Sequence, residues 1–388
     1  MSSQRIFLLA GEKSGDLLGA KLLDCLINDL PDYSFEGVGG VEMRARSFHS
    51  ILKSEDFETI GFIDVLFSFF KIRRQFSIVK QHILQTKPQA VVLIDYPGFN
   101  LKLAQLLRKH GFKGKIIQYV CPTVWAWGKH RIQQMAERFD LLLTIYPFEH
   151  NCFKETSLSV RYVGNPIQEN IANHHYDSDW TRLFGIKNSG HMIGIFPGSR
   201  KKEIELNLPY LIHAAEKIKK EDPAATFVLS CAHDKVISII HGLLQTNILK
   251  LNQDLFLLPK GYSYELMKDC RSAIAKSGTV CLELALHECP TVVIYKLSRL
   301  NRFIAKYLLK IRLPYYCIVN ILKQGEVFPE LIEKGLTKQN LYRQLKRIYS
   351  DAEARNSCIA ECRSLPELLR CHEASKNASK AICSLLNL

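Results

Sequence analysis

Midway along the chain stands the stretch Ile193-Gly-Ile-Phe-Pro-Gly-Ser-Arg-Lys-Lys-Glu-Ile-Glu205. It predicts a short apolar strand, a Pro-Gly turn and the start of a helix, whose free backbone N–H groups attract an anion. Ser199 suits the N-cap of that helix, and the Arg200 guanidinium could grip a phosphate through two hydrogen bonds. The plainer alternative is that Gly198 and Ser199 only cap the helix and that Arg200 is solvated.

A second turn of the same kind follows further along the chain. The apolar run 272–275 leads into Ser277-Gly278-Thr279, which opens another helix that carries Glu283 one turn later. Two strand ends that both offer small hydroxyl residues and a helix N-terminus favour a diphosphate-binding cradle over two unrelated caps.

Length and composition bound the answer. The chain has 388 residues, more than one core usually holds, so two domains are expected. Its 47% hydrophobic and 23% charged residues predict a globular, ordered protein. No apolar run reaches the length of a membrane span, and the run at 6–10 is too short for a signal peptide, so it predicts a first strand. The twelve cysteines show no Cys-x-x-Cys spacing, which favours buried thiols in a cytoplasmic protein.

The chain is strongly basic, with 52 Lys and Arg against 38 Asp and Glu, a net charge of +14 and a pI near 9.2. Such a balance suits a polyanionic partner. Zinc-finger spacing, an RNP-like aromatic motif and a lysine-rich tail are all missing, so nucleic acid is not expected as a partner. An anionic bilayer surface and phosphorylated substrates both remain candidate partners.

The first half opens with the strand at 6–10, the loop Gly11-Glu-Lys-Ser-Gly-Asp16 and an amphipathic helix, which is the start of a βαβ unit. The Gly-x-Gly-x-x-Gly spacing is missing, so an NAD enzyme is not expected. The apolar run 90–94 predicts a strand buried on both faces, and Asp95 follows it where α/β enzymes place catalytic groups. The alternative is that Asp95 only caps the next helix.

Two tryptophans, Trp125 and Trp127, follow another buried strand at 115–120, and they suit a sugar or acyl face as well as a core. The polar segment 168–190 contains Asp177-Ser-Asp179 and His174-His175, but no apolar strand precedes them. That segment therefore predicts a linker rather than a metal site.

Strands and helices alternate in both halves, which predicts an α/β fold with two Rossmann-like domains facing each other across a cleft. The expected division is a first domain at 1–167, a linker at 168–190, a second domain at 191–340 and a C-terminal helical segment at 341–388.

Taken together, the motifs resemble those of the lipid-A-disaccharide synthase family. They occur in the family's order: Ala10-Gly-Glu-Lys-Ser-Gly-Asp16, Gly37-Val-Gly-Gly40, Asp95-Tyr-Pro-Gly-Phe-Asn100, Pro122-Thr-Val-Trp-Ala-Trp127 with Arg131, Val163-Gly-Asn-Pro166, Pro197-Gly-Ser-Arg200 with Glu203, Ser277-Gly-Thr279 with Glu283, and Asn320 ahead of Glu326 and Glu330. The resemblance implies a GT-B glycosyltransferase that joins UDP-2,3-diacylglucosamine to 2,3-diacylglucosamine 1-phosphate (lipid X), inverts the anomeric centre and releases UDP. The chain departs from the family at Gly98, where Asp is usual, and at Asn165, where His is usual, so proton transfer at position 165 is in doubt.

The chemistry assigns roles to the strand-end residues. An inverting transfer needs a base for the attacking hydroxyl, and Asp95 is the predicted base. The leaving diphosphate needs charge stabilisation, which we expect from Arg200 and from the helix starts at Ser199 and Ser277-Gly278-Thr279, without a metal or cofactor. Glu283 is expected to accept hydrogen bonds from the ribose. By resemblance, the acceptor side holds Gly11, Glu12, Ser14, Gly15, Asp16, Trp125, Trp127 and Arg131, and the nucleotide-sugar side holds Asn320, Glu326 and Glu330.

Both implied substrates carry acyl chains, so a peripheral position on the inner face of the bacterial inner membrane is expected. One candidate contact is the bulky apolar stretch 62–72 with its basic end, in particular Phe67, Phe69, Phe70, Lys71, Arg73 and Arg74. A second is the amphipathic segment 299–310, with basic residues at Arg299, Arg302, Lys306 and Lys310. The alternative for both is an ordinary core-facing surface.

Two other classes of function stay open. Another UDP-sugar enzyme of this fold, such as an epimerase or a peptidoglycan-lipid transferase, would share the UDP cradle but need no acyl pockets. A non-catalytic sugar-nucleotide sensor would keep Arg200 and Glu283 and make no use of Asp95. The oligomeric state is also open, with a homodimer as one candidate.

Overall fold

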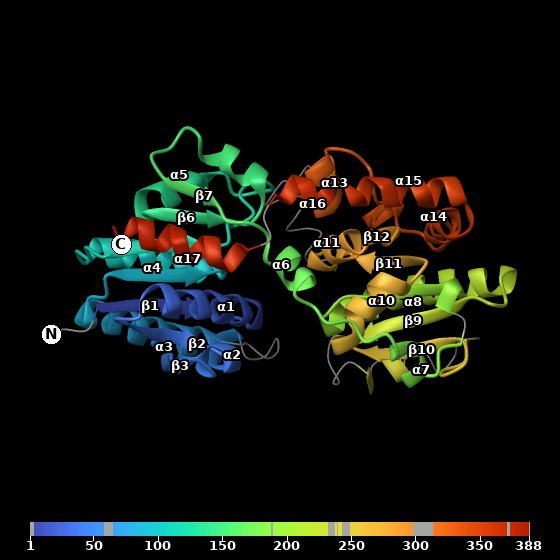
Figure 1. Ribbon diagram of the computed structural model, residues 1–388, viewed down its shortest axis with the longest axis horizontal. Coiled ribbons are helices and arrows are strands. Elements are labelled where there is room, and N and C mark those ends of the chain that lie inside the picture. Colours follow the sequence, from blue (N-terminus) through green and yellow to red (C-terminus); the bar gives the residue numbers. More distant parts are fainter. Residues whose placement is uncertain are drawn as a thin grey trace. The chain divides into compact units, whose positions relative to one another are not determined.

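The computed structural model describes residues 4–57, 65–187, 189–231, 237–238, 240–242, 249–297, 313–370 and 373–387 (Figure 1). The chain divides into two compact units. Unit 1 comprises Met1–Glu169 and Cys371–Leu388, and unit 2 comprises Asn170–Arg370. In the described part of the chain, no helix is long and apolar enough to span a bilayer.

Unit 1 is built on a seven-stranded parallel sheet with the order β3-β2-β1-β4-β5-β6-β7. The strands are β1 (Gln4–Ala10), β2 (Tyr33–Gly39), β3 (His49–Lys53), β4 (Ala90–Ile94), β5 (Lys115–Tyr119), β6 (Leu141–Thr144) and β7 (Ser159–Tyr162). The order reverses between β1 and β4, where Ala10 lies opposite Ile94. Open α/β sheets bind ligands beyond the carboxyl ends of the strands at such a switch point.

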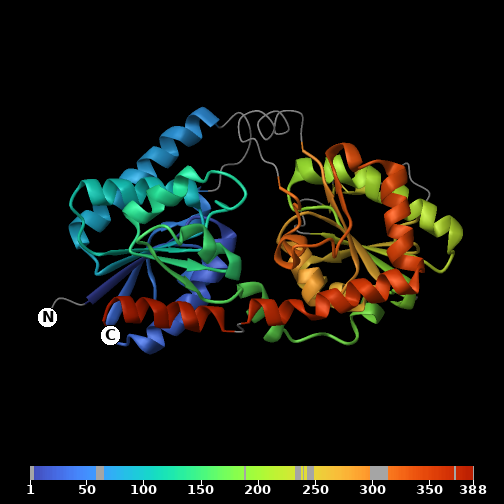
Figure 2. The ribbon, with the colours of Figure 1, turned by 90° about the horizontal axis from the view of Figure 1, so that it is seen from above.

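Helices cover both faces of this sheet (Figure 2). The helices of unit 1 are α1 (Lys13–Asp29), α2 (Val41–Arg44), α3 (Val65–Thr86), α4 (Pro97–Lys109), α5 (His130–Arg138) and α17 (Ala374–Leu385), with 3-10 turns at Ser54–Phe57 and Pro147–Phe153. Helix α6 (Pro166–Ala172) crosses the boundary with unit 2. The core on one face gathers side chains of α3, α4 and α5, and the core on the other gathers those of α1 and α17. The apolar strands are buried because both faces are covered.

Unit 2 repeats the plan with a six-stranded parallel sheet of order β10-β9-β8-β11-β12-β13. The strands are β8 (Met192–Phe196), β9 (Thr226–Cys231), β10 (Leu255–Pro259), β11 (Ser272–Lys276), β12 (Thr291–Tyr295) and β13 (Glu330–Ile332). The helices with described bounds are α7 (Trp180–Leu183), α8 (Lys201–Glu221), α10 (Ser263–Asp269), α11 (Thr279–Leu286), α13 (Ile318–Lys323), α14 (Lys338–Ser350), α15 (Ala352–Arg363) and α16 (Leu365–Leu369), with 3-10 turns at Ser189–His191, Lys260–Tyr262 and Glu333–Gly335. Its switch point lies between β8 and β11, where Phe196 is opposite Ala275.

The C-terminal helices are shared between the units, in contrast to the single segment expected at 341–388. Helices α14 to α16 belong to unit 2, whereas α17 belongs to unit 1 and packs along α1. The Ser379 hydroxyl donates a 2.6 Å hydrogen bond to Asp29 at the end of α1. The sequence gives no local sign of this return, because the contact joins residues from opposite ends of the chain.

The segment expected as a linker is also largely packed. The Trp180 side chain is fully buried in unit 2, and its indole N–H donates a 2.7 Å hydrogen bond to Asp269. His174 lies 2.9 Å from the buried Glu265 carboxylate. These polar pairs therefore anchor the segment to unit 2 instead of being solvated.

Candidate active site

Asp95 stands at the switch point of unit 1, immediately after β4. Asp95 and Tyr96 both adopt left-handed backbone conformations, with φ of +50° and +47°. Helix α4 then begins at Pro97, and its N-cap is Tyr96, with no side-chain capping bond. The alternative that Asp95 caps this helix is therefore wrong. Two successive non-glycine residues at positive φ are rare, and such strain gathers at functional sites.

Two buried amides hold the main chain of Asp95 in place. Gln118 donates from Nε2 to the Asp95 carbonyl at 3.1 Å, and Asn100 donates from Nδ2 to the same oxygen. Gln118 also donates to the carbonyl of Val120, a β-branched residue with φ of +73°. Asn100 and Gln118 are almost fully buried, so their hydrogen bonds brace both strained turns without competition from water. Sequence reasoning missed Gln118, because nothing local marks a strand residue as a brace.

The Asp95 carboxyl is half-buried, and burial raises its pKa above the usual range, opposed by a hydrogen bond from the backbone of Tyr96. Desolvation disfavours the carboxylate relative to the acid, which makes the carboxylate a stronger base. The side chain is therefore better suited to accepting a proton than an exposed aspartate.

The loop after β1 lies against this turn. A Cβ at Gly11 would come within 2.8 Å of the Tyr96 ring, so only glycine allows the approach. Gly15 is buried against the carboxyl end of β4, while Glu12 and Ser14 are exposed. The structure thus brings the Gly11 loop and Asp95 together at the switch point, as the strand order requires.

Asp16, expected on the acceptor side, is instead committed to the fold. It is 4% exposed, and its carboxylate accepts hydrogen bonds from the backbone N–H groups of Gly40, Glu42 and Met43 at 2.7, 2.9 and 3.1 Å. These donors form the start of α2, where an anion also interacts favourably with the helix dipole. Asp16 therefore ties α1 to the turn after β2.

The tryptophan loop forms a second polar and aromatic group in unit 1. The Arg131 guanidinium stacks on Trp127 at 4.2 Å from the ring centre, and Trp125 packs edge-to-face on Phe148. Glu149, which sequence reasoning did not single out, interacts with Trp125. Its buried carboxylate accepts hydrogen bonds from the backbone of Ile145 and Tyr146 at 3.2 and 3.1 Å. Burial nevertheless raises the pKa of Glu149 to about 8.

In unit 2, the turn after β8 exposes its polar side chains. Gly198 has φ of +114°, and the N-cap of α8 is Arg200 rather than Ser199, without a side-chain capping bond. Ser199 is exposed, so its hydroxyl lies just before the helix start. The Arg200 side chain is 83% exposed and only approaches Glu203 at 3.9 Å, which leaves its guanidinium donors available. The helix start and this cation are the kinds of group that bind anions in other proteins.

The turn after β11 lies beside it across the switch point. Gly278 is the N-cap of α11, and Gly278 and Thr279 are exposed, while Ser277 Oγ donates to the Tyr316 carbonyl at 3.2 Å. Lys276, another residue missed by sequence reasoning, pairs with Glu203 at 3.2 Å and so links the β11 end to α8. One turn into α11, Glu283 accepts a 3.2 Å hydrogen bond from the Tyr264 hydroxyl. Burial raises the pKa of Glu283, and this hydrogen bond opposes the rise.

Asn320 and Glu330 form an internal network rather than an exposed surface. The fully buried Asn320 donates to the Phe328 carbonyl and to Glu330, and accepts from the N–H groups of Val327 and Phe328. Glu330 also accepts from the N–H groups of Tyr316 and Cys317 at 2.8 and 2.9 Å. Both residues therefore position the chain before α13, beside Ser277. Glu326 is exposed.

The remaining expected residues have these places. Asn165 is buried. Its side-chain amide donates a hydrogen bond to the Ile145 carbonyl and accepts one from the Ile167 N–H, so it stabilises the fold. Arg73 and Arg74 are exposed on α3. Phe67, Phe69, Phe70 and Lys71 fall within the same helix, but their side chains lie outside what the structure describes, as does the whole segment 299–310. Within the described ranges, no group of three or more His, Cys, Asp or Glu side chains could hold a metal ion.

The chain matches the family described as lipid-A-disaccharide synthetase over residues 6–383. A lipid-A-disaccharide synthase of Chlamydia pneumoniae is 39% identical over 326 residues, which cover 84% of this chain and 53% of that protein. The chain thus spans about half the length of the chlamydial relatives that it matches. The enzyme of that name from Coxiella burnetii is 30% identical over 386 residues, 100% of both chains.

A solved UDP-N-acetylglucosamine 2-epimerase superposes with a TM-score of 0.62 at 9% identity, over 100% of this chain and 96% of that one, which supports the GT-B fold alone. The family match and the two relatives show the family as well as the fold. The chain belongs to the lipid-A-disaccharide synthetase family.

Proposed function

We propose that the chain transfers the diacylglucosamine of UDP-2,3-diacylglucosamine to 2,3-diacylglucosamine 1-phosphate, giving a lipid A disaccharide 1-phosphate and UDP. Family membership supports the reaction class. The observation that carries the proposal is Asp95, a carboxylate with a raised pKa in a strained turn at the switch point of unit 1. Such a group is suited to activating a sugar hydroxyl.

In the proposed step, the acceptor hydroxyl oxygen attacks the anomeric carbon of the donor while its proton passes to the Asp95 carboxylate. The bond from the anomeric carbon to the β-phosphate oxygen breaks, and its electron pair leaves with UDP. Attack on the face opposite the leaving group inverts the anomeric centre. Because the hydroxyl is a weak nucleophile, a base positioned by Gln118 and Asn100 lowers the barrier.

The donor diphosphate would bind unit 2 at the starts of α8 and α11. Arg200 is exposed and available for two charge-assisted hydrogen bonds, and the N–H groups near Ser199, Gly278 and Thr279 complete the cradle. Glu283, held by Tyr264, is oriented to accept from the ribose hydroxyls. Charge on the leaving group is then stabilised where it develops.

The acceptor would bind unit 1, with the Gly11 loop and the stacked pair of Arg131 and Trp127 as its polar and aromatic contacts. Both substrates carry acyl chains, so the proposal includes a peripheral position on the inner face of the bacterial inner membrane. The apolar sequence and basic end of the stretch 62–72 support that position.

Mass spectrometry of the products tests the reaction directly. The pure protein with both acylated monosaccharides should give the disaccharide 1-phosphate and UDP. Turnover of unacylated UDP-N-acetylglucosamine alone would instead favour an epimerase, and UDP binding without any turnover would favour a sugar-nucleotide sensor. Either result would overturn the proposed reaction.

A further inference from the structure

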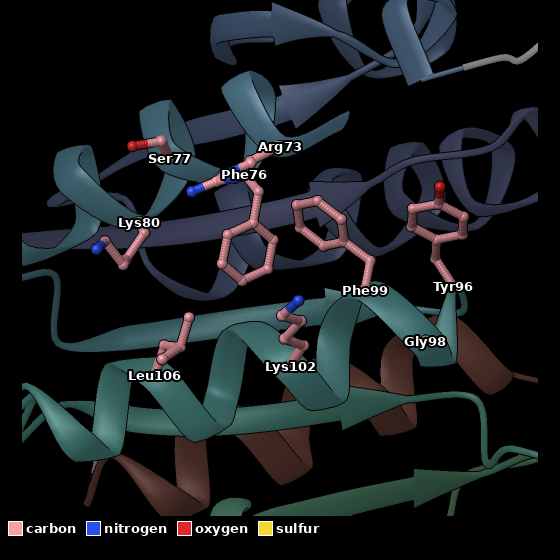
Figure 3. A pocket seen from close by; sticks show the side chains of 9 residues that line it. All are labelled: Arg73, Phe76, Ser77, Lys80, Tyr96, Gly98, Phe99, Lys102 and Leu106. Atoms are coloured by element: carbon pink, nitrogen blue, oxygen red, sulfur yellow. The ribbon is translucent and has the colours of Figure 1, made fainter. Parts of the chain in front are cut away.

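A groove of about 650 Å³ lies between α3 and α4 in unit 1, next to the Asp95 turn (Figure 3). Its volume is within the range of roughly 300–1,000 Å³ typical of small-molecule sites. Its walls are Arg73, Phe76, Ser77 and Lys80 from α3, and Tyr96, Gly98, Phe99, Lys102 and Leu106 from the Asp95 turn and α4. Tyr96 directly follows Asp95 in the chain and Gly98 comes two residues later, so one end of the groove is formed by the turn that carries the proposed base.

The interior of the groove is aromatic. Phe76 and Phe99 meet edge-to-face with ring centres 5.0 Å apart, and Tyr96 stacks on Phe99 at 5.6 Å. Figure 3 shows the three rings in a row between the two helices, with Leu106 beyond Phe76. Phe99 is packed in the hydrophobic core of unit 1, which holds its ring in position. An apolar chain laid along the rings would remove apolar surface from water, which is favourable in proportion to the area covered.

Three cations border the same groove. Arg73 and Lys102 are exposed and Lys80 is half-buried, and Lys102 Nζ lies 5.9 Å from the centre of the Phe76 ring. Among the described residues, no carboxylate lies within ion-pair distance of any of the three. Arg108 on the same helix differs, because it is paired with Asp140. Cations that pair with no described carboxylate, placed around an aromatic trough, fit a ligand with an anionic head and an apolar tail.

The end of the groove beside Asp95 is open. A Cβ added to Gly98 would meet no atom within 4 Å, so the space in front of this residue, three positions after the proposed base, is open. A ligand in the groove could therefore extend past Gly98, along the first turn of α4, toward the turn that carries Asp95.

We propose that this groove binds the acceptor lipid, with its 1-phosphate held by Lys102, Lys80 and Arg73 and one acyl chain laid along Phe76, Phe99 and Leu106. The inference rests on the proposed function for the identity of the ligand, since the acceptor is the substrate that carries both a phosphate monoester and acyl chains. The groove thereby selects the phosphorylated acceptor and brings its sugar to Asp95.

Binding can be measured without turnover. Dodecyl phosphate, below its micellar concentration, should bind the full chain in calorimetry more tightly than dodecyl maltoside or inorganic phosphate. Lys80→Ala/Lys102→Ala should weaken that binding about tenfold or more. The control Lys109→Ala/Lys113→Ala removes the same charge from exposed residues outside the groove and should change nothing. The proposal would be overturned if the two double variants bound dodecyl phosphate equally well. It would also be overturned if the wild type bound inorganic phosphate as tightly as dodecyl phosphate.

Filling the groove provides a second, charge-neutral test. Gly98→Leu places a side chain in open space in the first turn of α4, so the thermal unfolding midpoint should not fall. It should raise the KM for the acceptor about tenfold or more and leave the Kd for UDP unchanged. An unchanged acceptor KM, in an enzyme that makes disaccharide, would overturn the groove and leave the reaction standing. If the wild type makes no disaccharide, the reaction fails while the dodecyl phosphate titration still decides the groove.

Membrane attachment must also be separated from substrate binding. Vesicles of phosphatidylglycerol should retain Lys80→Ala/Lys102→Ala as well as they retain the wild type at equal salt. A loss of vesicle binding with an unchanged acceptor KM would make the groove a membrane-contact surface and contradict the assignment.

Discussion

The side-chain amide of Gln118 donates a 3.1 Å hydrogen bond to the main-chain carbonyl of Asp95, on the neighbouring strand end. The same amide reaches the carbonyl of Val120 at 3.1 Å. One buried group therefore fixes two turns that each contain a residue at positive φ. The position of the proposed base thus depends on a residue that is itself buried within the sheet.

Replacing Gln118 should show whether its hydrogen bonds position Asp95 for catalysis or only stabilise the fold. Gln118→Leu removes the hydrogen bonds and should lower kcat about tenfold while destabilising the fold by about 1–3 kcal/mol, because buried carbonyls lose their donor. Thr144→Val is the matched control, since it removes another buried polar group from the same sheet, 3.5 Å from the Arg161 carbonyl. A Gln118→Leu enzyme with unchanged kcat would show that the brace serves the fold alone.

Arg200 should contribute to UDP binding. Arg200→Ala should weaken the binding of UDP by about 2 kcal/mol or more in calorimetry, because a charge-assisted contact to the diphosphate is lost. Arg182→Ala removes an equally exposed arginine that pairs with Asp179 in the same unit, and it should leave UDP binding unchanged. If both variants bind UDP equally, Arg200 is a solvated surface residue.

Asp16 should affect folding rather than the acceptor. Asp16→Ala leaves the N–H groups of Gly40, Glu42 and Met43 without their acceptor and should lower the free energy of unfolding in urea by about 2–4 kcal/mol. The exposed pair of Asp24 and Arg46 provides the comparison, and Asp24→Ala should cost less than about 1 kcal/mol. A near-neutral Asp16→Ala that raises the acceptor KM would return Asp16 to the substrate site.

Glu149 should make stability depend on pH. Its pKa is about 8 in the folded chain and near 4.5 when unfolded, so between these values the folded state binds more protons than the unfolded state. Stability contributed by this group is then present below about pH 4.5 and is lost as pH rises to about 8, by at most about 1.4 kcal/mol per pH unit.

Glu149→Gln keeps an acceptor for the Ile145 and Tyr146 N–H groups but cannot ionise. Urea unfolding from pH 5 to pH 9 should therefore show the variant gaining stability relative to the wild type up to about pH 8, with a constant difference above it. If the unfolding free energies of the two proteins ran parallel over this pH range, Glu149 would be ionised in the folded wild type throughout it.

Local patterns predicted the parts of the fold that depend on neighbouring residues. The apolar run 90–94 became the buried β4, and the Pro-Gly turn at 197–198 became the entry to α8. Because parallel strands align their carboxyl ends, the pattern also brought Asp95 next to the Gly11 loop, and the turn after β8 next to the turn after β11. These placements follow from strand order and need no long-range information.

The rest depends on contacts between distant positions. Asp16 meets the turn at Gly40, Gln118 meets Asp95, and α17 returns to α1 across most of the chain. In each of these contacts, a polar side chain bonds to a backbone group or side chain that is distant in the sequence, and no local spacing identifies that partner. The same reason explains Asn320, whose four hydrogen bonds are made within a folded loop rather than toward a ligand.

The most direct test of the central claim is the turnover number of Asp95→Asn with both acylated substrates. The amide keeps the size of the carboxylate but cannot accept the proton, so kcat should fall about 100-fold or more. The Kd for UDP, measured on the same preparation, should match the wild type, because Arg200 and Glu283 lie in unit 2. A variant that keeps most of its turnover would contradict the account, since another group would then take the proton.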